Sequence, residues 1–203
     1  EIELYELTDI DKFSKRKDVF DIGKEDECKK SISWEELKNM KLEFPMVLFP
    51  FSVASSRSIP NKKIKEWLYG SNQSVLILGS EGDAVLANSL INECTGIKLI
   101  NLCGKYSMRQ SMALISVCQF SLASDSGLGH ISASLGIPTI SVFGAGDSEM
   151  TKPIGKRTFV INKNVYCSPC RKNVCMNIEE PLVCLKNIAR SDIENAVNSF
   201  INQ

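Results

Sequence analysis

The sequence predicts an α/β fold in which helices cover both faces of a doubly wound, Rossmann-like parallel sheet. Three observations lead to this prediction. Short apolar runs alternate with segments of helical periodicity from Met46 onward, and such runs are typical of parallel strands buried on both faces. Glycine, proline and serine mark the ends of several helical segments. Polar and glycine-rich loops follow the apolar runs, as expected where ligands bind at the carboxyl ends of parallel strands.

The chain divides into two expected units. Residues 1–44 are highly charged and poorly periodic, and Ser33 and Glu36 form a capping box ahead of a short apolar pattern. We interpret 1–44 as an interdomain linker with one or two helices. We interpret 45–203 as the α/β domain, with a cysteine-rich loop at 165–186.

The elements of this domain follow from local signals. Pro60 opens the first helix, Ser107 caps a later one, and Gly136 ends the helix after that. Ser191 and Glu194 form a second capping box, at the start of the last helix. The expected strands are 46–51, 74–79, 97–102, 119–124, 138–143 and 158–162. The expected helices are 60–69, 83–94, 107–117, 126–135 and a last one from about 192.

Length and charge limit the classes of function. The 203 residues suffice for one α/β domain of ordinary size. Basic and acidic side chains number 24 each, so no net field favours nucleic acid or an anionic membrane surface as a partner. No apolar run approaches the roughly 18 residues that span a bilayer. We therefore expect no transmembrane segment, no signal peptide and a cytoplasmic protein.

The most informative segment is DSGLGH, because it places an acidic turn and a helix start after a buried strand. The N–H groups and the positive dipole end of such a helix attract an anion, and a diphosphate is the natural ligand. We expect the backbone at Gly129 to approach the phosphate, so that a bulky residue there abolishes binding but leaves the fold largely intact. An ordinary β–α connection with a good N-cap is the alternative. The expected binding residues are Asp125, Ser126, Gly127, Leu128, Gly129 and His130.

Five segments in order resemble the ADP-heptose:lipopolysaccharide heptosyltransferases, glycosyltransferase family 9. The DSGLGH segment, followed by SASLGIP and VFG, is similar to the donor-site signature of that family. The segments Pro50–Pro60 and Leu76–Ala87 are similar to two of its loop regions, and NLCGK at Asn101–Lys105 resembles its NLxGK segment. A cysteine cluster near the C-terminus is also seen in many members. The resemblance covers about residues 45–190.

The resemblance implies the C-terminal, donor-binding half of a two-domain GT-B glycosyltransferase. Such an enzyme transfers a sugar from a nucleotide-diphosphate donor, here ADP-heptose, to a saccharide or a lipid-A-core-like acceptor. The acceptor site and the general base belong to the N-terminal domain, so this chain carries no catalytic residue of its own and is inactive alone. His130, the one histidine, would stabilise the leaving diphosphate. The parent protein is expected in the cytoplasm, and peripheral contact with the inner membrane is left open.

The loops after the first three expected strands supply the other candidate donor contacts. Ser52, Ser55, Ser56 and Arg57 offer hydroxyls and a forked guanidinium to a diphosphate. The family usually has lysine in place of Arg57. Asp83 matches a ribose-binding acid, and an acid that complements a helix dipole is the alternative. Lys105 and Met108 match positions that flank the nucleotide base, although a methionine at a helix start is more often part of a core.

The cysteines form two groups. Cys28, Cys94, Cys103 and Cys118 are scattered through core-like segments and are interpreted as small buried apolar residues. The other four form a C-x2-C-x4-C-x8-C cluster, whose spacing is compatible with a structural zinc site. Reduced thiols or a disulfide are the alternatives. The cluster consists of Cys167, Cys170, Cys175 and Cys184.

Two other functions remain open. A nucleotide-sugar epimerase, such as the UDP-N-acetylglucosamine 2-epimerases, shares the architecture and the Asp-Ser-Gly turn. Those enzymes follow the turn with paired glutamates, whereas this chain has His130 and Ile131. A nucleotide-sugar-binding module without transfer activity is the non-enzymatic alternative. For the glycosyltransferase, no cofactor beyond the nucleotide-sugar donor is required, and no metal is needed for transfer if Arg57, Lys105 and the helix dipole neutralise the phosphates.

Overall fold

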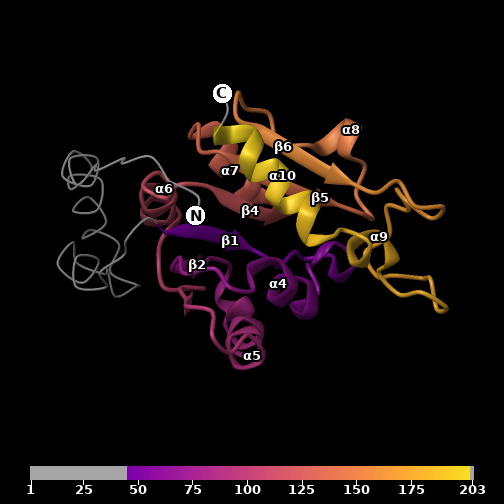
Figure 1. Ribbon diagram of the computed structural model, residues 1–203, viewed down its shortest axis with the longest axis horizontal. Coiled ribbons are helices and arrows are strands. Elements are labelled where there is room, and N and C mark those ends of the chain that lie inside the picture. The colour runs from indigo at the N-terminus through magenta and orange to yellow at the C-terminus, as the bar shows by residue number, and fades with distance from the viewer. Residues whose placement is uncertain (1–44, 202–203) are drawn as a thin grey trace.

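The computed structural model describes residues 45–201, which form one six-stranded sheet. All strands are parallel, in the order β3-β2-β1-β4-β5-β6 (Figure 1). The order reverses between the central strands β1 and β4, and ligands of open α/β sheets bind at the carboxyl side of such a switch point. The strands are β1 (Met46–Phe49), β2 (Val75–Ile77), β3 (Leu99–Asn101), β4 (Ser121–Ser124), β5 (Thr139–Phe143) and β6 (Thr158–Asn162).

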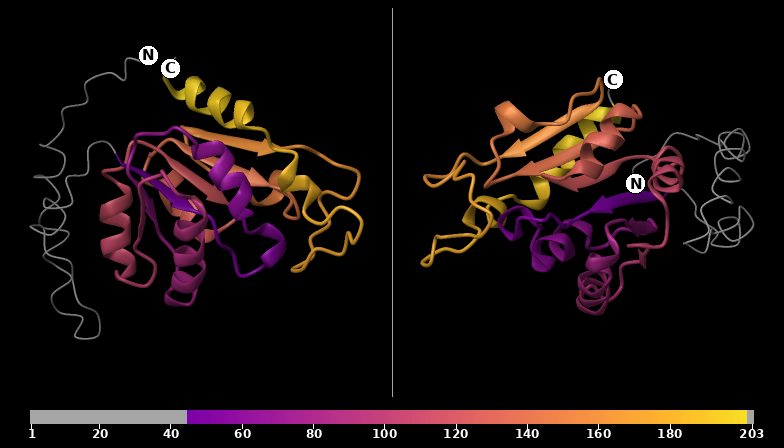
Figure 2. Two further views of the ribbon diagram at one scale, coloured as in Figure 1. Left: turned by 60° about the horizontal axis from the view of Figure 1, so that its bottom comes forward. Right: turned by 180° about the vertical axis from the view of Figure 1, so that it is seen from behind.

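Helices cover both faces of the sheet, as Figures 1 and 2 show. The first face carries α4 (Asn61–Leu68), α5 (Ala84–Glu93) and α10 (Arg190–Ile201), and the second carries α6 (Met108–Ile115) and α7 (Gly127–Ser134). The short helices are η2 (Ser55–Arg57), η3 (Glu81–Asp83), α8 (Ser148–Thr151) and α9 (Val183–Lys186). The predicted doubly wound α/β architecture is therefore confirmed.

Each strand contributes alternate side chains to two separate cores. Met46 and Leu48 of β1 pack with Trp67 of α4 on the first face, whereas Val47 and Phe49 pack with the α6 side on the second. All four β1 side chains are almost completely buried. This double burial explains why the strand sequences are continuous apolar runs.

The element boundaries agree closely with those expected. The first strand ends at Phe49 and not at residue 51, because the chain leaves the ladder at Pro50. The last helix begins at Arg190, where the carboxylate of Asp192 accepts a hydrogen bond of 2.7 Å from the backbone N–H of Ala189. Sequence patterns missed the four short helices, which are too short to show a periodicity. The linker expected at 1–44 lies outside the described residues.

Helix α7 approaches β4 very closely. A Cβ atom added at Gly129 would lie 2.9 Å from the Cβ of Ala123. Next to this contact, the hydroxyls of Ser121, Ser132 and Thr139 lie 2.8–3.1 Å from one another in the buried space between β4, α7 and β5. The small residues of α7 thus bring its N-terminus down onto the carboxyl end of the central strand.

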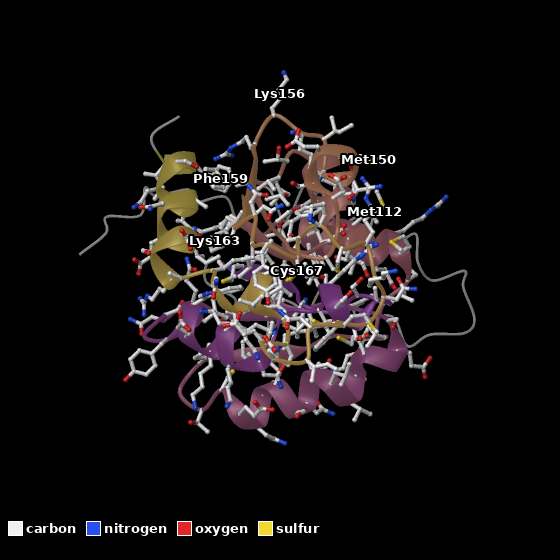
Figure 3. The ribbon with its side chains drawn as sticks, turned by 90° about the vertical axis from the view of Figure 1, so that its right-hand side faces the viewer. Met112, Met150, Lys156, Phe159, Lys163 and Cys167 are labelled. Carbon is white, nitrogen blue, oxygen red and sulfur yellow. The ribbon has the colours of Figure 1, made fainter. Side chains whose placement is uncertain are left out.

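The segment between β6 and α9 extends along the carboxyl edge of the sheet, on the right in Figure 1. Figure 3 looks onto this edge and places Cys167 near the middle of the face. We call residues 165–186 the cysteine loop. Within residues 45–201, no helix has the length and apolar character that a membrane span requires.

Candidate functional site

The loops that follow β1 and β4 are bonded to each other at the switch point. Ser52 Oγ donates to the carbonyl of Asp125 at 3.2 Å, and Ser124 Oγ donates to the carbonyl of Phe51 at 3.2 Å. The β1 loop closes on itself, because the backbone N–H of Ser52 donates to Ser58 Oγ at 3.0 Å. The two loops therefore form one hydrogen-bonded rim above the central strands.

Arg57 and Asp125 form an ion pair across this rim. Arg57 Nη1 lies 3.3 Å from Asp125 Oδ2, and the exposed fractions of the two side chains are 31% and 6%. Burial raises the pKa of the Asp125 carboxyl, although the nearby Arg57 and His130 act to lower it. The guanidinium is thus held by one carboxylate and remains accessible to a second anion.

The N-terminus of α7 opens beside this ion pair. Ser126 is the N-cap residue, and its side chain makes no capping hydrogen bond. Its Oγ is buried and has no hydrogen-bond partner among the described residues. A Cβ atom at Gly127 would meet nothing within 4 Å, and His130 is exposed one turn further on. An uncapped helix start with an unpaired hydroxyl and a nearby guanidinium suits a phosphate group.

The expectation that a bulky residue at Gly129 spares the fold is wrong. Gly129 is buried against Ala123 of β4, and its N–H already donates to the carbonyl of Ser126 at 3.2 Å. Its missing side chain therefore permits helix–sheet packing. Gly127, by contrast, is a glycine at which an added Cβ atom would point into open space. Leu128, the residue between them, packs partly buried against the second core.

Three serine hydroxyls expected to bind the diphosphate are engaged within the protein. Ser52 Oγ donates to Asp125, Ser55 Oγ donates to the carbonyl of Asn173 at 3.3 Å, and Ser56 Oγ donates to the carbonyl of Lys172. A hydroxyl has one proton to donate, so none of the three donates to a phosphate in this arrangement. Arg57 is the side chain of the β1 loop that remains for that role.

The candidate residues of the β2 and β3 loops lie on the same edge of the sheet. Asp83 Oδ2 accepts hydrogen bonds from the backbone N–H and the Oγ of Ser80, at 2.8 and 2.7 Å. These bonds form a capping box at the start of η3, which supports the alternative that Asp83 is an acid serving a helix start. Lys105 is exposed in the turn after β3, and Met108 is 58% exposed at the start of α6. Met108 is therefore a surface residue and not part of the core.

The four cysteines of the cysteine loop are free thiols that lie near one another. Burial, and to a lesser extent the nearby Cys167, Cys175 and Cys170, raises the pKa of the Cys184 thiol. The backbone N–H of Leu182 donates to Cys175 Sγ at 3.3 Å. Across the described part of the chain, no group of three or more His, Cys, Asp or Glu side chains has a metal-holding arrangement.

Two features of the site escaped the sequence analysis. A Cβ atom at Gly146 would lie 1.9 Å from Asp125 Oδ2, so this glycine packs directly on the buried carboxylate. The residues Arg171–Asn173 of the cysteine loop contact the loops after both β1 and β5. The G-x-G pattern at Gly144–Gly146 was a visible signal for the first feature. The second had none, because the contacting groups are mostly backbone carbonyls.

Comparisons with known proteins agree with one another. A family model described as glycosyltransferase family 9 (heptosyltransferase) matches residues 32–179. Lipopolysaccharide heptosyltransferase 2 of Salmonella typhimurium is 24% identical over 149 residues, which cover 63% of this chain and 43% of that protein. The structure of E. coli ADP-heptose LPS heptosyltransferase II has a TM-score of 0.66 at 21% identity and covers 86% of this chain and 54% of its own. E. coli heptosyltransferase WaaC with ADP has a TM-score of 0.58 at 20% identity, covering 82% and 46%. The chain thus spans about half the length of these relatives.

Proposed function

The chain belongs to glycosyltransferase family 9, and from that premise we propose that it binds the nucleotide-diphosphate sugar donor of a heptosyltransferase-like enzyme. The donor we infer is ADP-heptose. The name of the Salmonella relative and the ADP bound to WaaC support this inference. In the whole protein, the sugar would pass to a lipopolysaccharide-type acceptor held by a second, N-terminal domain.

One observation carries the proposal: Arg57, whose side chain is 31% exposed, places Nη1 3.3 Å from a buried carboxylate at the uncapped start of α7. A diphosphate placed there would meet a fixed guanidinium, the positive end of a helix and the unpaired hydroxyl of Ser126. These groups lie at the switch point of the sheet, which is where ligands of open α/β sheets bind.

The same groups would serve the chemistry of transfer. When the bond between the sugar and the diphosphate breaks, negative charge grows on the leaving diphosphate, and a preorganised guanidinium and helix N-terminus stabilise that charge. His130, exposed on the first turn of α7, is placed to donate a hydrogen bond to it. The base that takes the proton of the acceptor hydroxyl would come from the N-terminal domain.

Isothermal titration calorimetry with ADP tests the proposal. We expect Arg57→Ala to weaken ADP binding by roughly 10-fold to 100-fold, because it removes a charge-assisted hydrogen bond worth about 1.5–3 kcal/mol. Arg57→Lys, which keeps the charge, should lose less. Lys156→Ala removes an exposed cation just before β6, at the opposite edge of the sheet, and serves as the control. Absence of heat with wild-type protein and millimolar ADP would refute the proposal.

The alternatives predict different results in the same assay. An epimerase-like protein would prefer UDP-sugars to ADP-sugars, so a panel of ADP-, UDP- and GDP-sugars distinguishes it. A non-catalytic module would bind donor but stay inactive when joined to the rest of the protein.

We also propose that the parent protein works in the cytoplasm, at or near the membrane that carries its acceptor, which fractionation of cells would test.

We further propose that the cysteine loop takes up one structural zinc ion. Four neighbouring cysteine sulfurs are ligands of the kind that zinc prefers, and the N–H that donates to Cys175 Sγ favours the thiolate form of that sulfur. In the described residues these sulfurs do not yet form a metal-holding group, so binding requires them to move together. Metal analysis of reduced protein should find about one equivalent, and a chelator should lower the melting temperature. A value near zero would leave the cluster as thiols or disulfides.

A further inference from the structure

The residues Arg171–Asn173, which we call the strap, are anchored on the loop that follows β5. The backbone N–H of Arg171 donates to the carbonyl of Ala145 at 2.7 Å, and its guanidinium pairs with the carboxylate of Asp147. Just before the strap, Ser168 Oγ donates to the carbonyl of Gly144. The hydrogen bond from Arg171, more than any other contact, lowers the pKa of Asp147. The strap is therefore fixed on one side of the switch point.

The other side of the strap holds the β1 loop. The carbonyl of Asn173 accepts hydrogen bonds from the N–H of Ser56 at 3.1 Å and from Ser55 Oγ at 3.3 Å. The carbonyl of Lys172 accepts from Ser56 Oγ, and Ser56 is only 1% exposed. The next residue is Arg57, so the strap is bonded to the residues directly before the guanidinium that faces Asp125.

The strap lies between Cys170 and Cys175 in the sequence. Both of these thiols, and Cys167, lie close enough to Cys184 to affect its pKa. Cys175 accepts a hydrogen bond from Leu182 near the start of α9. Cys184 is packed on the β5 loop, since a Cβ atom added at Gly144 would lie 2.5 Å from its Sγ. A change in what these sulfurs bind would move the chain on both sides of the strap.

We propose that the strap positions Arg57 for donor binding, and that the bonding state of the loop cysteines sets donor affinity through Ser56. The inference rests on the proposed function, since it concerns the same donor site. The serines of the β1 loop act in it as positioning residues, and their hydroxyls serve the protein's own backbone. The cysteine loop is then a working part of the donor site, coupled to it by three hydrogen bonds.

Selective alkylation tests this coupling. N-ethylmaleimide should modify the exposed and half-exposed Cys167, Cys170 and Cys175 in a chain whose Cys28 is replaced by serine. Burial protects the remaining thiols and raises their pKa, to about 12 for Cys103. We expect alkylation to weaken ADP binding by about tenfold, the order of one or two lost hydrogen bonds. Amide hydrogen exchange over residues 52–59 should rise at the same time.

Two variants show whether the effect passes through Ser56. Ser56→Ala should weaken ADP binding, and alkylation should add little to that loss. Ser116→Ala removes a similar bond, 2.7 Å from Ser116 Oγ to the carbonyl of Ala113, at the far edge of the sheet. This control should bind and respond as wild type does.

The possible failures are distinguishable. If wild-type protein does not bind ADP, the proposed function fails, and hydrogen exchange over 52–59 still decides whether the strap holds the β1 loop. If alkylation changes neither the exchange nor the affinity, the strap does not position the site. An equal response in Ser56→Ala and wild type would also overturn the inference.

Discussion

Asp125 is a carboxylate whose surroundings disfavour its charge. Its side chain is 6% exposed, Gly146 packs on one carboxylate oxygen, and an ion pair with Arg57 partly compensates its charge. Burial raises its pKa because charge is costly in a poorly hydrated place, and the attraction of Arg57 and His130 only partly offsets this. The charged carboxylate is therefore unfavourable for folding. Its place beside the proposed donor site gives a reason for its presence.

Asp125→Asn should change how stability depends on pH. An aspartate whose pKa is raised by folding binds its proton more tightly in the folded chain. Its contribution to stability therefore falls as pH rises from its ordinary value of 3.8 through the raised one. The free energy of unfolding of wild type relative to Asp125→Asn should decline over this range and then level off. Urea unfolding at a series of pH values measures it.

Asp192→Asn is the matched control, with the opposite sign. Burial acts to raise the pKa of Asp192, but hydrogen bonds from Lys163 and from the N–H of Ala189 lower it overall. Wild type should therefore gain stability relative to Asp192→Asn as pH rises through the lowered value and up to 3.8. A difference for Asp125→Asn that grew with pH would contradict the environment described for it.

At this scale the sequence predicted which loops meet better than it predicted what their side chains contact. The DSGLGH segment and Arg57 do lie together at the switch point, because loops after adjacent parallel strands must meet. The directions of the hydroxyls of Ser55 and Ser56 could not be predicted. Their partners are backbone carbonyls more than 100 residues away, and such acceptors leave no trace in side-chain identity.

At the scale of elements, the closeness of α7 to β4 decides what the helix can do. Gly129 and Ala123 allow the contact, and the hydroxyls of Ser121 and Ser132 fill the space beside it. A larger residue at the contact would push the helix start away from the rim. The role of a glycine in α7 depends on whether an added Cβ atom would meet β4 or open space.

Two alanine substitutions in the same helix should therefore have opposite effects. Gly129→Ala should lower stability by about 1–3 kcal/mol through overpacking. Gly127→Ala adds a Cβ in open space and should be neutral or stabilising by up to about 1 kcal/mol. Thermal unfolding of the two variants measures both. Equal melting temperatures would mean that α7 does not pack on β4 as described.

Strands and long helices were predictable because burial on both faces and helical periodicity act over many residues. The 3-residue η2 and η3 and the 4-residue α8 and α9 were not, since each is too short to show a periodicity. The β1 loop illustrates this. The turn at Ser55–Arg57 is bonded to the strap, which lies more than 100 residues later in the sequence.

At the scale of the whole molecule, the sheet order and the share of its relatives' length that the chain covers both bear on whether it can transfer sugar. The loops after β1 and β4 meet at the switch point, and the chain covers 43% of the length of the Salmonella relative. Catalysis by transfer needs donor and acceptor held in one geometry. A chain that holds the donor alone can bind it without bringing donor and acceptor together.

We therefore expect the chain of 203 residues to bind donor without transferring sugar. Incubation with ADP-heptose and a lipopolysaccharide acceptor, followed by mass spectrometry of the acceptor, measures transfer. The full-length parent protein under the same conditions is the positive control. Turnover by the chain alone would show that residues 1–203 contain a complete catalytic centre.

The ion pair between Arg57 and Asp125 also makes the ligand and a proton interdependent. A diphosphate that draws on the guanidinium would leave a buried carboxylate with weaker compensation and a new negative neighbour, so its pKa would rise further. Binding would then take up protons from solution. The calorimetric heat should change with the ionisation enthalpy of the buffer, and affinity should fall as the medium becomes more alkaline.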